Sequence, residues 1–331
     1  RLDLVAGVVQ GHRDGHGVLY PEAGGDSLIL PPKQMRRIFH GDRVLCCVVE
    51  MDRRGKKIGS IVEIVESNTK QVVGRFFDEM GVGFVEPDNR KITHNILIPK
   101  EHQLNAENGK LVVCEIVMQP EGRQQPIGKI IEVLGDHLAP GMEIDVAVRS
   151  HGIPHVWPEA VTAEVQKLSS LLDAGEYKNR FDFRNLPFVT IDGEDARDFD
   201  DAVYCEPAKV GKGKGWRLLV AIADVSNYVE TGSAIDVDAY ERATSVYFPR
   251  RVIPMLPEKL SNGLCSLNPN VDRLVMVCDA VITAKGVIDA YQFYPAVFRS
   301  HARLTYTDVW EALSVPGSRA AQRVGDLMPH L

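Results

Sequence analysis

Acidic side chains crowd the stretch TIDGEDARDFDDAVYCE, where positions 192–201 hold six acids and one base. Like charges this close repel one another, so a folded protein gathers them where a cation offsets the charge. Carboxylates on a loop at a strand end suit Mg²⁺, which keeps waters for a phosphate substrate. Two such ions can activate an attacking water and stabilise the leaving oxygen of a phosphodiester. The pattern predicts metal-assisted chemistry on a phosphate ester.

Two other uses of closely spaced acids do not fit this stretch. An EF-hand calcium loop starting at Asp192 needs glycine at its sixth position and glutamate at its twelfth, where the chain has Arg197 and Val203. A phosphatase with an aspartyl nucleophile needs a second aspartate two residues later, where Glu194 stands. A solvated acidic loop is the remaining alternative, and the apolar segments on both sides disfavour it.

The segments around the acids predict an α+β domain from Phe181 onward. Strands are predicted at 187–191, 202–206 and 216–225, with a hairpin over 274–298. A helix capped by serine is predicted over 233–243. The glycine-lysine run 211–215 lacks the spacing of a phosphate-binding loop and is interpreted as a hairpin loop.

The spacing of the last three aspartates constrains their local structure. Residues 198, 200 and 201 cannot all point to one side of a regular strand, because successive side chains alternate between its faces. We therefore expect Phe199 to pack inward at a turn while the neighbouring carboxylates face a cavity.

The first part of the chain contains an internal duplication. GHGVLYP (15–21) returns as GVGFVEP (81–87), and HGDRVLCCVV (40–49) returns as NGKLVVCEIV (108–117). Matches in the same order at nearly constant offset indicate two copies of one domain rather than a solenoid.

Each copy has the pattern of a small all-β barrel. Short β-branched runs are broken by Gly, Pro, Asn and Asp at intervals of about ten residues, which favours a five-stranded OB barrel, with another small barrel as the alternative. The Gly-x-Gly in the second strand suits strong curvature. OB barrels commonly bind single-stranded nucleic acid. The sequence HRDGH (12–16) is similar to a kinase catalytic loop, but it lies inside the first predicted barrel and not in a kinase context.

A connector with one helix is predicted between the barrels and the α+β domain. Pro158 falls in its first turn and Gly175 ends it, with an apolar stripe at Val161, Val165, Leu168 and Leu172. His151 and His155 have the spacing of a helical metal pair, but Pro154 between them favours a loop.

Bulk composition is that of an ordinary globular protein. The 331 residues are 44% hydrophobic and 25% charged, and no apolar run reaches the roughly 20 residues that span a bilayer. With no secretory signal at the start, we expect a cytoplasmic protein without a membrane partner. The six cysteines show no CxxC spacing and predict buried, reduced thiols.

The net charge of −7 argues against bulk attraction to nucleic acid. Much of that charge belongs to the acids of 192–201, so a metal there would offset most of it. RNA contact would then depend on local basic patches such as 31–37 and 51–57.

Three blocks of the sequence resemble the RNB exoribonucleases, the family of ribonuclease II and ribonuclease R. They are TIDGEDARDFDDAVY (190–204), TSVYFPRRVIPMLPEKLSNGLCSLNP (244–269) and SHARLTYT (300–307). Two cold-shock (OB) domains before an RNB domain are that family's architecture. VDRLVMVC (271–278) makes the chain more similar to the ribonuclease R branch. The resemblance covers almost the whole chain.

The resemblance implies a processive 3′→5′ exoribonuclease that hydrolyses single-stranded RNA to nucleoside 5′-monophosphates with Mg²⁺ and no organic cofactor. Asp192, Asp198 and Asp201 match metal-site carboxylates of the family, so Asp198 also counts as catalytic. Asp200 matches the essential carboxylate beside the scissile phosphate. Tyr247 matches a tyrosine that packs on the 3′-terminal base; a core aromatic is the alternative.

The second barrel is the better candidate for stacking on RNA bases. We expect Phe76, Phe77 and Phe84 to contact RNA there, whereas the equivalent strand of the first barrel, GHGVLY, lacks such aromatics.

The expected organisation is that of an N-terminal fragment. The family's RNB domain is longer than residues 181–331 and precedes another RNA-binding domain, while ribonuclease R also has an N-terminal helix-turn-helix. Two functions are therefore predicted, the exoribonuclease or a catalytically silent RNA-binding fragment, with the oligomeric state left open. The predicted parts are two barrels, a helical connector and a partial α+β RNB domain, over 1–67, 68–150, 151–180 and 181–331.

Overall fold

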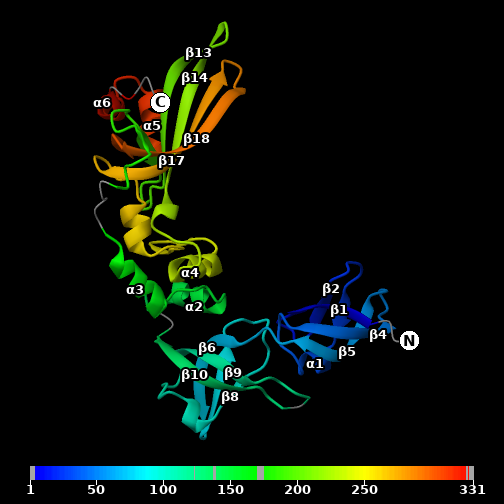
Figure 1. Cartoon of the computed structure of the whole chain (residues 1–331). Coiled ribbons are helices and arrows are strands. Elements are labelled where there is room, and N and C mark those ends of the chain that lie inside the picture. The colour runs from blue at the N-terminus through cyan, green and yellow to red at the C-terminus, as the bar shows by residue number, and fades with distance from the viewer. Residues whose placement is uncertain (1–3, 123, 137–138, 170–174, 326, 328–331) are drawn as a thin grey trace. The chain divides into compact units, whose positions relative to one another are not determined.

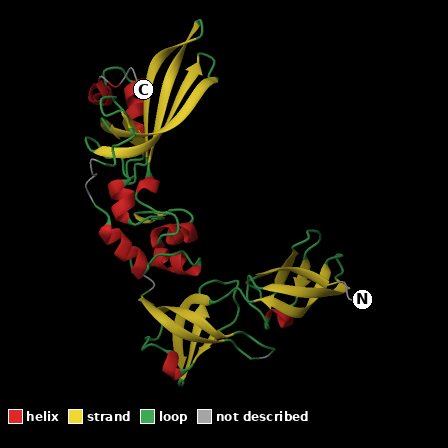
Figure 2. Cartoon of the chain, in the orientation of Figure 1, coloured by secondary structure: helices red, strands yellow, loops and turns green. Residues whose placement is uncertain are grey.

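The computed structural model describes all residues except 1–3, 123, 137–138, 170–174, 326 and 328–331 (Figure 1). The chain divides into two compact units, Arg1–Ile153 and Pro154–Leu331. Most of the regular secondary structure of the first unit is strand, and the second unit combines strands with helices (Figure 2).

The first barrel closes five strands around an apolar core. Its strand order is β1-β2-β3-β5-β4, with β3 parallel to β5 and the other pairs antiparallel. Val9, Leu19 and Val44 on three of the strands are completely buried. The elements are β1 (Leu4–Gly11), β2 (Gly17–Pro21), β3 (Leu28–Leu30), α1 (Pro32–Met35), β4 (Arg43–Met51) and β5 (Lys57–Glu66).

The second barrel repeats the first strand for strand. Its order, β10-β8-β7-β6-β9, is the same circuit, so the predicted duplication and the OB-like barrels are confirmed. The elements are β6 (Gln71–Glu79), β7 (Val82–Pro87), β8 (Ile96–Ile98), η1 (Lys100–His102), β9 (Leu111–Met118) and β10 (Ile127–Gly135), followed by helix α2 (Met142–Ser150).

The Gly-x-Gly strands explain why glycine occurs at the same place in both barrels. A β-carbon on Gly17 would lie 2.3 Å from the Met35 sulfur, and one on Gly83 would lie 2.3 Å from the Gln103 side-chain nitrogen. Another part of each barrel therefore packs directly against the curved strand, as close backbone approach requires.

The connector helix α3 (Glu159–Lys167) is shorter than predicted. Pro158 is its N-cap rather than a residue of the first turn, and Leu168 is already extended, with φ −63° and ψ 127°. Ser169 follows, and serine favours helix ends because its hydroxyl competes for backbone hydrogen bonds. The predicted stripe residue Leu172 lies outside the described residues.

The connector packs on helix α4 (Ala234–Arg242) of the second unit. Glu164 accepts hydrogen bonds from the Ala234 and Ile235 amides at 2.9 and 3.0 Å, which caps the start of α4. At the other end, the Arg242 guanidinium lies 3.6 Å from the Trp157 ring centroid and donates to the Pro154 carbonyl. Arg242 also pairs with the Asp238 carboxylate at 2.6 Å, so a carboxylate, carbonyls and a ring hold this buried cation.

A seven-stranded sheet forms the centre of the second unit, in the order β11-β18-β17-β14-β13-β12-β19. The predicted strands and the 274–298 hairpin are present. Within the run 211–215, Gly211 and Lys212 make the tight β13–β14 turn, and residues 213–215 already belong to β14. The strands are β11 (Phe181–Asp182), β12 (Val189–Asp192), β13 (Asp201–Val210), β14 (Gly213–Ala223), β17 (Asp272–Thr283), β18 (Ile288–Arg299) and β19 (Ala302–Thr305).

Short elements complete the second unit. Helix α4 is capped as predicted, because the Ser233 hydroxyl accepts from the Asp236 amide at 3.2 Å. The others are η2 (Val225–Asn227), β15 (Val246–Phe248), β16 (Arg251–Ile253), the π-helix η3 (Lys259–Leu264), α5 (Tyr306–Ser314) and α6 (Arg319–Val324).

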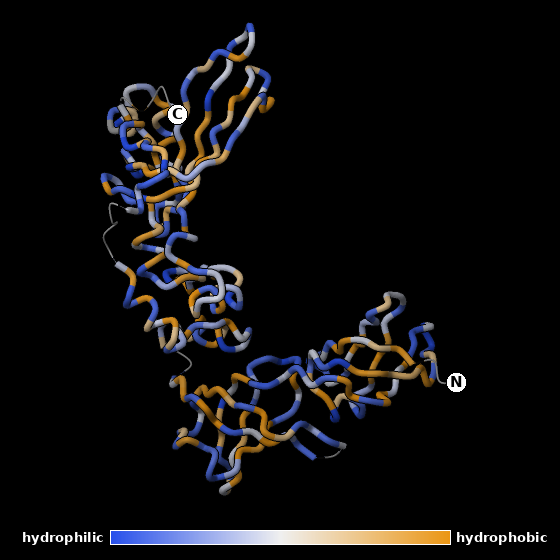
Figure 3. Tube along the Cα trace, in the orientation of Figure 1, coloured by the Kyte–Doolittle hydropathy of each residue, from blue (hydrophilic) through white to orange (hydrophobic). Residues whose placement is uncertain are grey.

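Hydrophobic residues concentrate on the strands of the barrels and the sheet, and the connecting loops are mostly hydrophilic (Figure 3). All six cysteines are free thiols, three buried and three half-buried. Burial raises the pKa of the Cys114 and Cys265 thiols to about 12, so they stay protonated. Within the described residues, no helix is long and apolar enough to cross a membrane.

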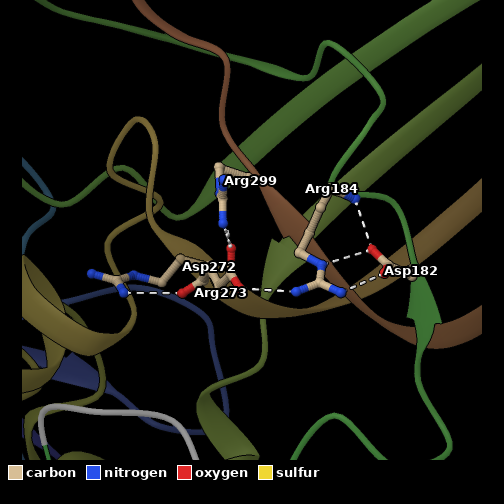
Figure 4. Close-up of polar contacts among 5 residues, drawn as sticks. All are labelled: Asp182, Arg184, Asp272, Arg273 and Arg299. Carbon is tan, nitrogen blue, oxygen red and sulfur yellow. Dashed lines mark hydrogen bonds and ion pairs between the residues drawn. The ribbon is translucent and has the colours of Figure 1, made fainter.

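An ion-pair network ties three neighbouring strands of the sheet together (Figure 4). Arg184 lies between two carboxylates, 2.6 Å from Asp182 of β11 and 3.3 Å from Asp272 of β17. Asp272 also pairs with Arg299 of β18 at 2.7 Å. The hydrogen bonds from Arg184 lower the pKa of Asp182 to about 2.

We expect Asp182→Asn to weaken the second unit in a pH-dependent way. A lowered carboxyl pKa contributes stability above the unfolded value of about 4, and that contribution is lost as the pH falls through about 2. Because Asp182 is half exposed, the loss at neutral pH is expected to stay below about 1 kcal/mol. Urea unfolding across this pH range measures it. Asp289→Asn, at an exposed site on β18, is the control, and equal pH profiles for both variants would contradict the prediction.

Candidate active site

The acidic stretch is the loop between β12 and β13, at one end of the sheet. Asp192 ends β12 beside Thr305 of the parallel strand β19, and Asp201 opens β13 opposite Ile222 of β14. Two of the predicted metal ligands thus stand at the ends of adjacent strands, where the backbone is held by ladder hydrogen bonds.

Phe199 anchors the middle of this loop. Its side chain is only 2% exposed, which confirms the predicted inward packing. The Arg303 guanidinium stacks on the ring at 4.0 Å from its centroid and donates to the Ala196 carbonyl. The backbone is fixed as well, since the Leu267 amide donates to the Phe199 carbonyl at 2.7 Å. The turn is therefore held through the Phe199 side chain and through its backbone.

The carboxylates around Phe199 repel one another. Burial raises the pKa of Asp200 above the ordinary carboxyl value, and the charges of Asp201, Asp198 and Asp192 raise it further. Burial also raises the pKa of Asp201, with a contribution from Asp192. Both side chains still reach solvent at their surface. A bound cation would relieve this repulsion, so the donor set fits a hard divalent ion.

The carboxylate oxygens do not converge on a single point. Among the described residues, no three acids of the loop bring their oxygens within 4.8 Å of one another. One Asp192 oxygen accepts from the Gly193 amide at 2.6 Å. With this spacing a single Mg²⁺ ion would contact one or two of the carboxylates directly, and waters or substrate oxygens would complete its shell.

Tyr247 lies beside the acidic loop although it is distant in sequence. It belongs to β15, which pairs with β16, and its hydroxyl donates to Asp198 at 2.7 Å. This hydrogen bond raises the pKa of Tyr247 to about 12, so the phenol stays protonated. The ring itself is 63% exposed, which excludes the alternative of a core aromatic and leaves a face available for stacking.

The prediction that Phe76 contacts RNA is wrong. Phe76 is 2% exposed and belongs to the core of the second barrel, so it cannot stack on a base. Phe77 and Phe84 pair across β6 and β7 with ring centroids 5.7 Å apart, and both are half-buried. They remain candidates for RNA contact.

Two supports of the site were not predicted from the sequence. Arg303 holds Phe199, and the Ser266 hydroxyl donates to the Arg197 carbonyl at 3.1 Å. Both lie in the blocks that suggested the family, yet no local pattern reveals a long-range contact. A mainly apolar pocket of about 560 Å³ also adjoins Asp201, lined by Val189, Ile191, Ala202, Val203, Tyr306, Val309, Trp310 and Leu313.

Family models match all three folded parts. A Ribonuclease B OB domain matches residues 7–64, a Cold shock domain matches 84–158 and an RNB domain matches 180–327. The fold and the acidic loop therefore define a protein in which two OB-type barrels precede an RNB domain.

Individual relatives within the RNB-domain proteins show which branch this chain is similar to. Ribonuclease R of Acidithiobacillus ferrooxidans is 46% identical over the whole chain, which covers 74% of that protein. Ribonuclease R of Escherichia coli K12 is 53% identical to this chain. The match covers 95% of this chain and 38% of the Escherichia coli protein. This chain belongs to the ribonuclease R family. It spans about two fifths of the length of several of these relatives.

The same relationship is found among solved structures. The RNase R of Mycoplasma genitalium, in complex with ribose methylated single-stranded RNA, matches with a TM-score of 0.83 and 25% identity. The match covers 96% of this chain and 51% of the other.

Proposed function

We propose that this chain carries the metal-binding carboxylates of a Mg²⁺-dependent 3′→5′ exoribonuclease that acts on single-stranded RNA. The observation that supports it most is the loop of four carboxylates, Asp192, Asp198, Asp200 and Asp201, anchored by Phe199 beside an exposed tyrosine. The relatives named ribonuclease R support the same reaction class.

In this proposal the carboxylates divide into two roles. Asp192, Asp198 and Asp201 would hold Mg²⁺. When bound, the ion would neutralise negative charge on the phosphate and lower the pKa of a bound water. Asp200 faces the scissile phosphate and accepts a proton from the attacking water at a carboxylate oxygen. The water oxygen bonds to phosphorus, and the bond from phosphorus to the 3′ oxygen of the preceding nucleotide breaks. That oxygen takes up a proton from solvent to become a hydroxyl, Asp200 returns its proton to solvent, and a nucleoside 5′-monophosphate is released.

The remaining parts would guide the RNA. The two barrels bind the single strand, with Phe77 and Phe84 as stacking candidates and no organic cofactor involved. We also propose that the domains of the chain meet at residues 67, 150 and 180, that the enzyme acts processively and that it is cytoplasmic.

Tyr247 gives a direct test of base stacking. We expect Tyr247→Ala to weaken binding of a short single-stranded RNA by roughly 1–3 kcal/mol, because one base loses its aromatic partner. Tyr247→Phe removes the hydrogen bond to Asp198 but keeps the ring, and should bind nearly as well as the parent. Fluorescence anisotropy in EDTA measures binding without cleavage. If phenylalanine weakens binding as much as alanine, the hydroxyl and not the ring carries the effect.

A second candidate function follows from the spread of the carboxylates. Because no three of these oxygens lie within 4.8 Å of one another in the described loop, the chain alone could bind RNA without cutting it. The two candidates separate in one assay on 5′-labelled single-stranded RNA with Mg²⁺ or EDTA. A ladder shortening from the 3′ end that EDTA abolishes supports the nuclease. RNA retained without shortening supports the silent binding fragment and contradicts catalysis by this chain.

A further inference from the structure

A second group of metal-ligating side chains lies far along the sequence from the acidic loop, in the first barrel. The turn between β1 and β2 reads HRDGH, and His12, Asp14 and His16 all extend from it. One ligand atom from each lies within 4.8 Å of the other two. Among the described residues, this group alone brings three His, Cys, Asp or Glu ligand atoms so close together.

The backbone of the turn holds the two histidines face to face. The His12 amide donates to the His16 carbonyl at 2.8 Å, and the Gly15 amide donates to the His12 carbonyl at 2.9 Å. Gly15 takes a left-handed φ of +87°, which few other residues adopt without strain. The imidazole rings consequently stack with centroids 4.5 Å apart and planes inclined by 27°.

The carboxylate completes a three-ligand set. An Asp14 oxygen lies 3.2 Å from His12 Nδ1. Ligands about 2.0–2.1 Å from a tetrahedral Zn²⁺ lie roughly 3.3 Å apart, so this pair already has the required spacing. His12 and Asp14 are 49% and 66% exposed at their side chains. A bound ion would replace the hydrogen bond from the Asp14 amide to His12 Nδ1 at 3.4 Å and the Arg13–Asp14 contact at 3.8 Å, and would draw His16 toward both ligands.

We propose that His12, Asp14 and His16 bind a borderline transition-metal ion such as Zn²⁺, with the fourth position open to water. Two imidazoles and one carboxylate are a common ligand set for Zn²⁺, and imidazole selects such ions over Mg²⁺. The ion would join both ends of the β1–β2 turn and so stabilise the first barrel. This site is chemically distinct from the acidic loop, which offers oxygen ligands.

Zinc titration of the whole, untagged chain tests the proposal. The protein is stripped with a chelator and titrated with Zn²⁺ by calorimetry, in excess Mg²⁺ so that the acidic loop does not compete. We expect one strong equivalent, weakened at least about tenfold in His12→Asn and in His16→Asn, since even residues behind the ligands contribute that much at metal sites. His102→Asn, a half-buried histidine of the second barrel, is the control and should bind like the parent.

Co²⁺ provides a second measurement that does not depend on the variants folding. The parent chain with one equivalent of Co²⁺ should show the intense visible absorption of a four-coordinate site, and the His12 and His16 ring protons should broaden in NMR spectra. Unchanged Zn²⁺ affinity in both histidine variants overturns the proposal. So does an equal loss in His102→Asn, or Co²⁺ broadening confined to other residues.

Discussion

Asp200→Asn is expected to slow RNA shortening by about 10²–10⁴-fold, the range typical of a positioned acid or base. The amide cannot accept the proton of the attacking water, while its shape is nearly the same as that of the carboxylate. Single-turnover cleavage of labelled RNA in Mg²⁺ measures the rate, in this chain and in a version extended to the length of its relatives. RNA binding in EDTA should be unaffected.

The same substitution should not harm folding. Because burial and neighbouring carboxylates raise the pKa of Asp200, the charged side chain costs stability as the pH rises through that raised value. Asn removes this cost, so the variant is expected to be at least as stable at neutral pH, with the difference fading as the pH falls. Asp195→Asn, in the same loop, is the matched control and should cleave normally. Cleavage at the parent rate by Asp200→Asn would refute the catalytic role.

Phe199→Ala is expected to destabilise the second unit by about 3–5 kcal/mol. The ring is completely enclosed, so its removal leaves a cavity and also takes away the surface on which Arg303 stacks. All three tryptophans, Trp157, Trp216 and Trp310, lie in the second unit. Tryptophan fluorescence during urea unfolding therefore follows this unit without interference from the barrels.

Two comparisons sharpen the test of Phe199. Phe199→Leu keeps most of the volume and should lose clearly less stability than alanine. Tyr240→Ala removes an 85% exposed ring on α4 and should change stability by no more than about 0.5 kcal/mol. If Phe199→Ala costs no more than Tyr240→Ala, the ring does not anchor the acidic loop.

The barrels were predictable because the information that specifies them is local and occurs twice. Recurring glycines, β-branched runs and turn residues at a nearly constant offset indicated two copies of one domain, and both copies close in the same strand order. Local signals also located the Ser233 cap of α4 and the tight turn between β13 and β14.

The errors arose where a local pattern allows more than one outcome. Phe76 and Phe77 are consecutive on β6, so they must face opposite sides of the strand. Which of them enters the barrel depends on the pairing register with β7 and β9, and that pairing places Phe76 inside. Helix α3 ends at Lys167, and the next stripe residue, Leu168, is already extended.

For the site, the sequence alone was enough to place the carboxylates on one loop and to predict the inward turn at Phe199, because these residues lie within ten positions of one another. Only the tertiary structure brought Tyr247 to Asp198, 49 positions away, and Arg303 to the Ala196 carbonyl, 107 positions away. Such contacts depend on how β15 and β19 are placed against the loop. Short-range patterns carry no information about that placement, because it results from packing and strand register across the whole sheet.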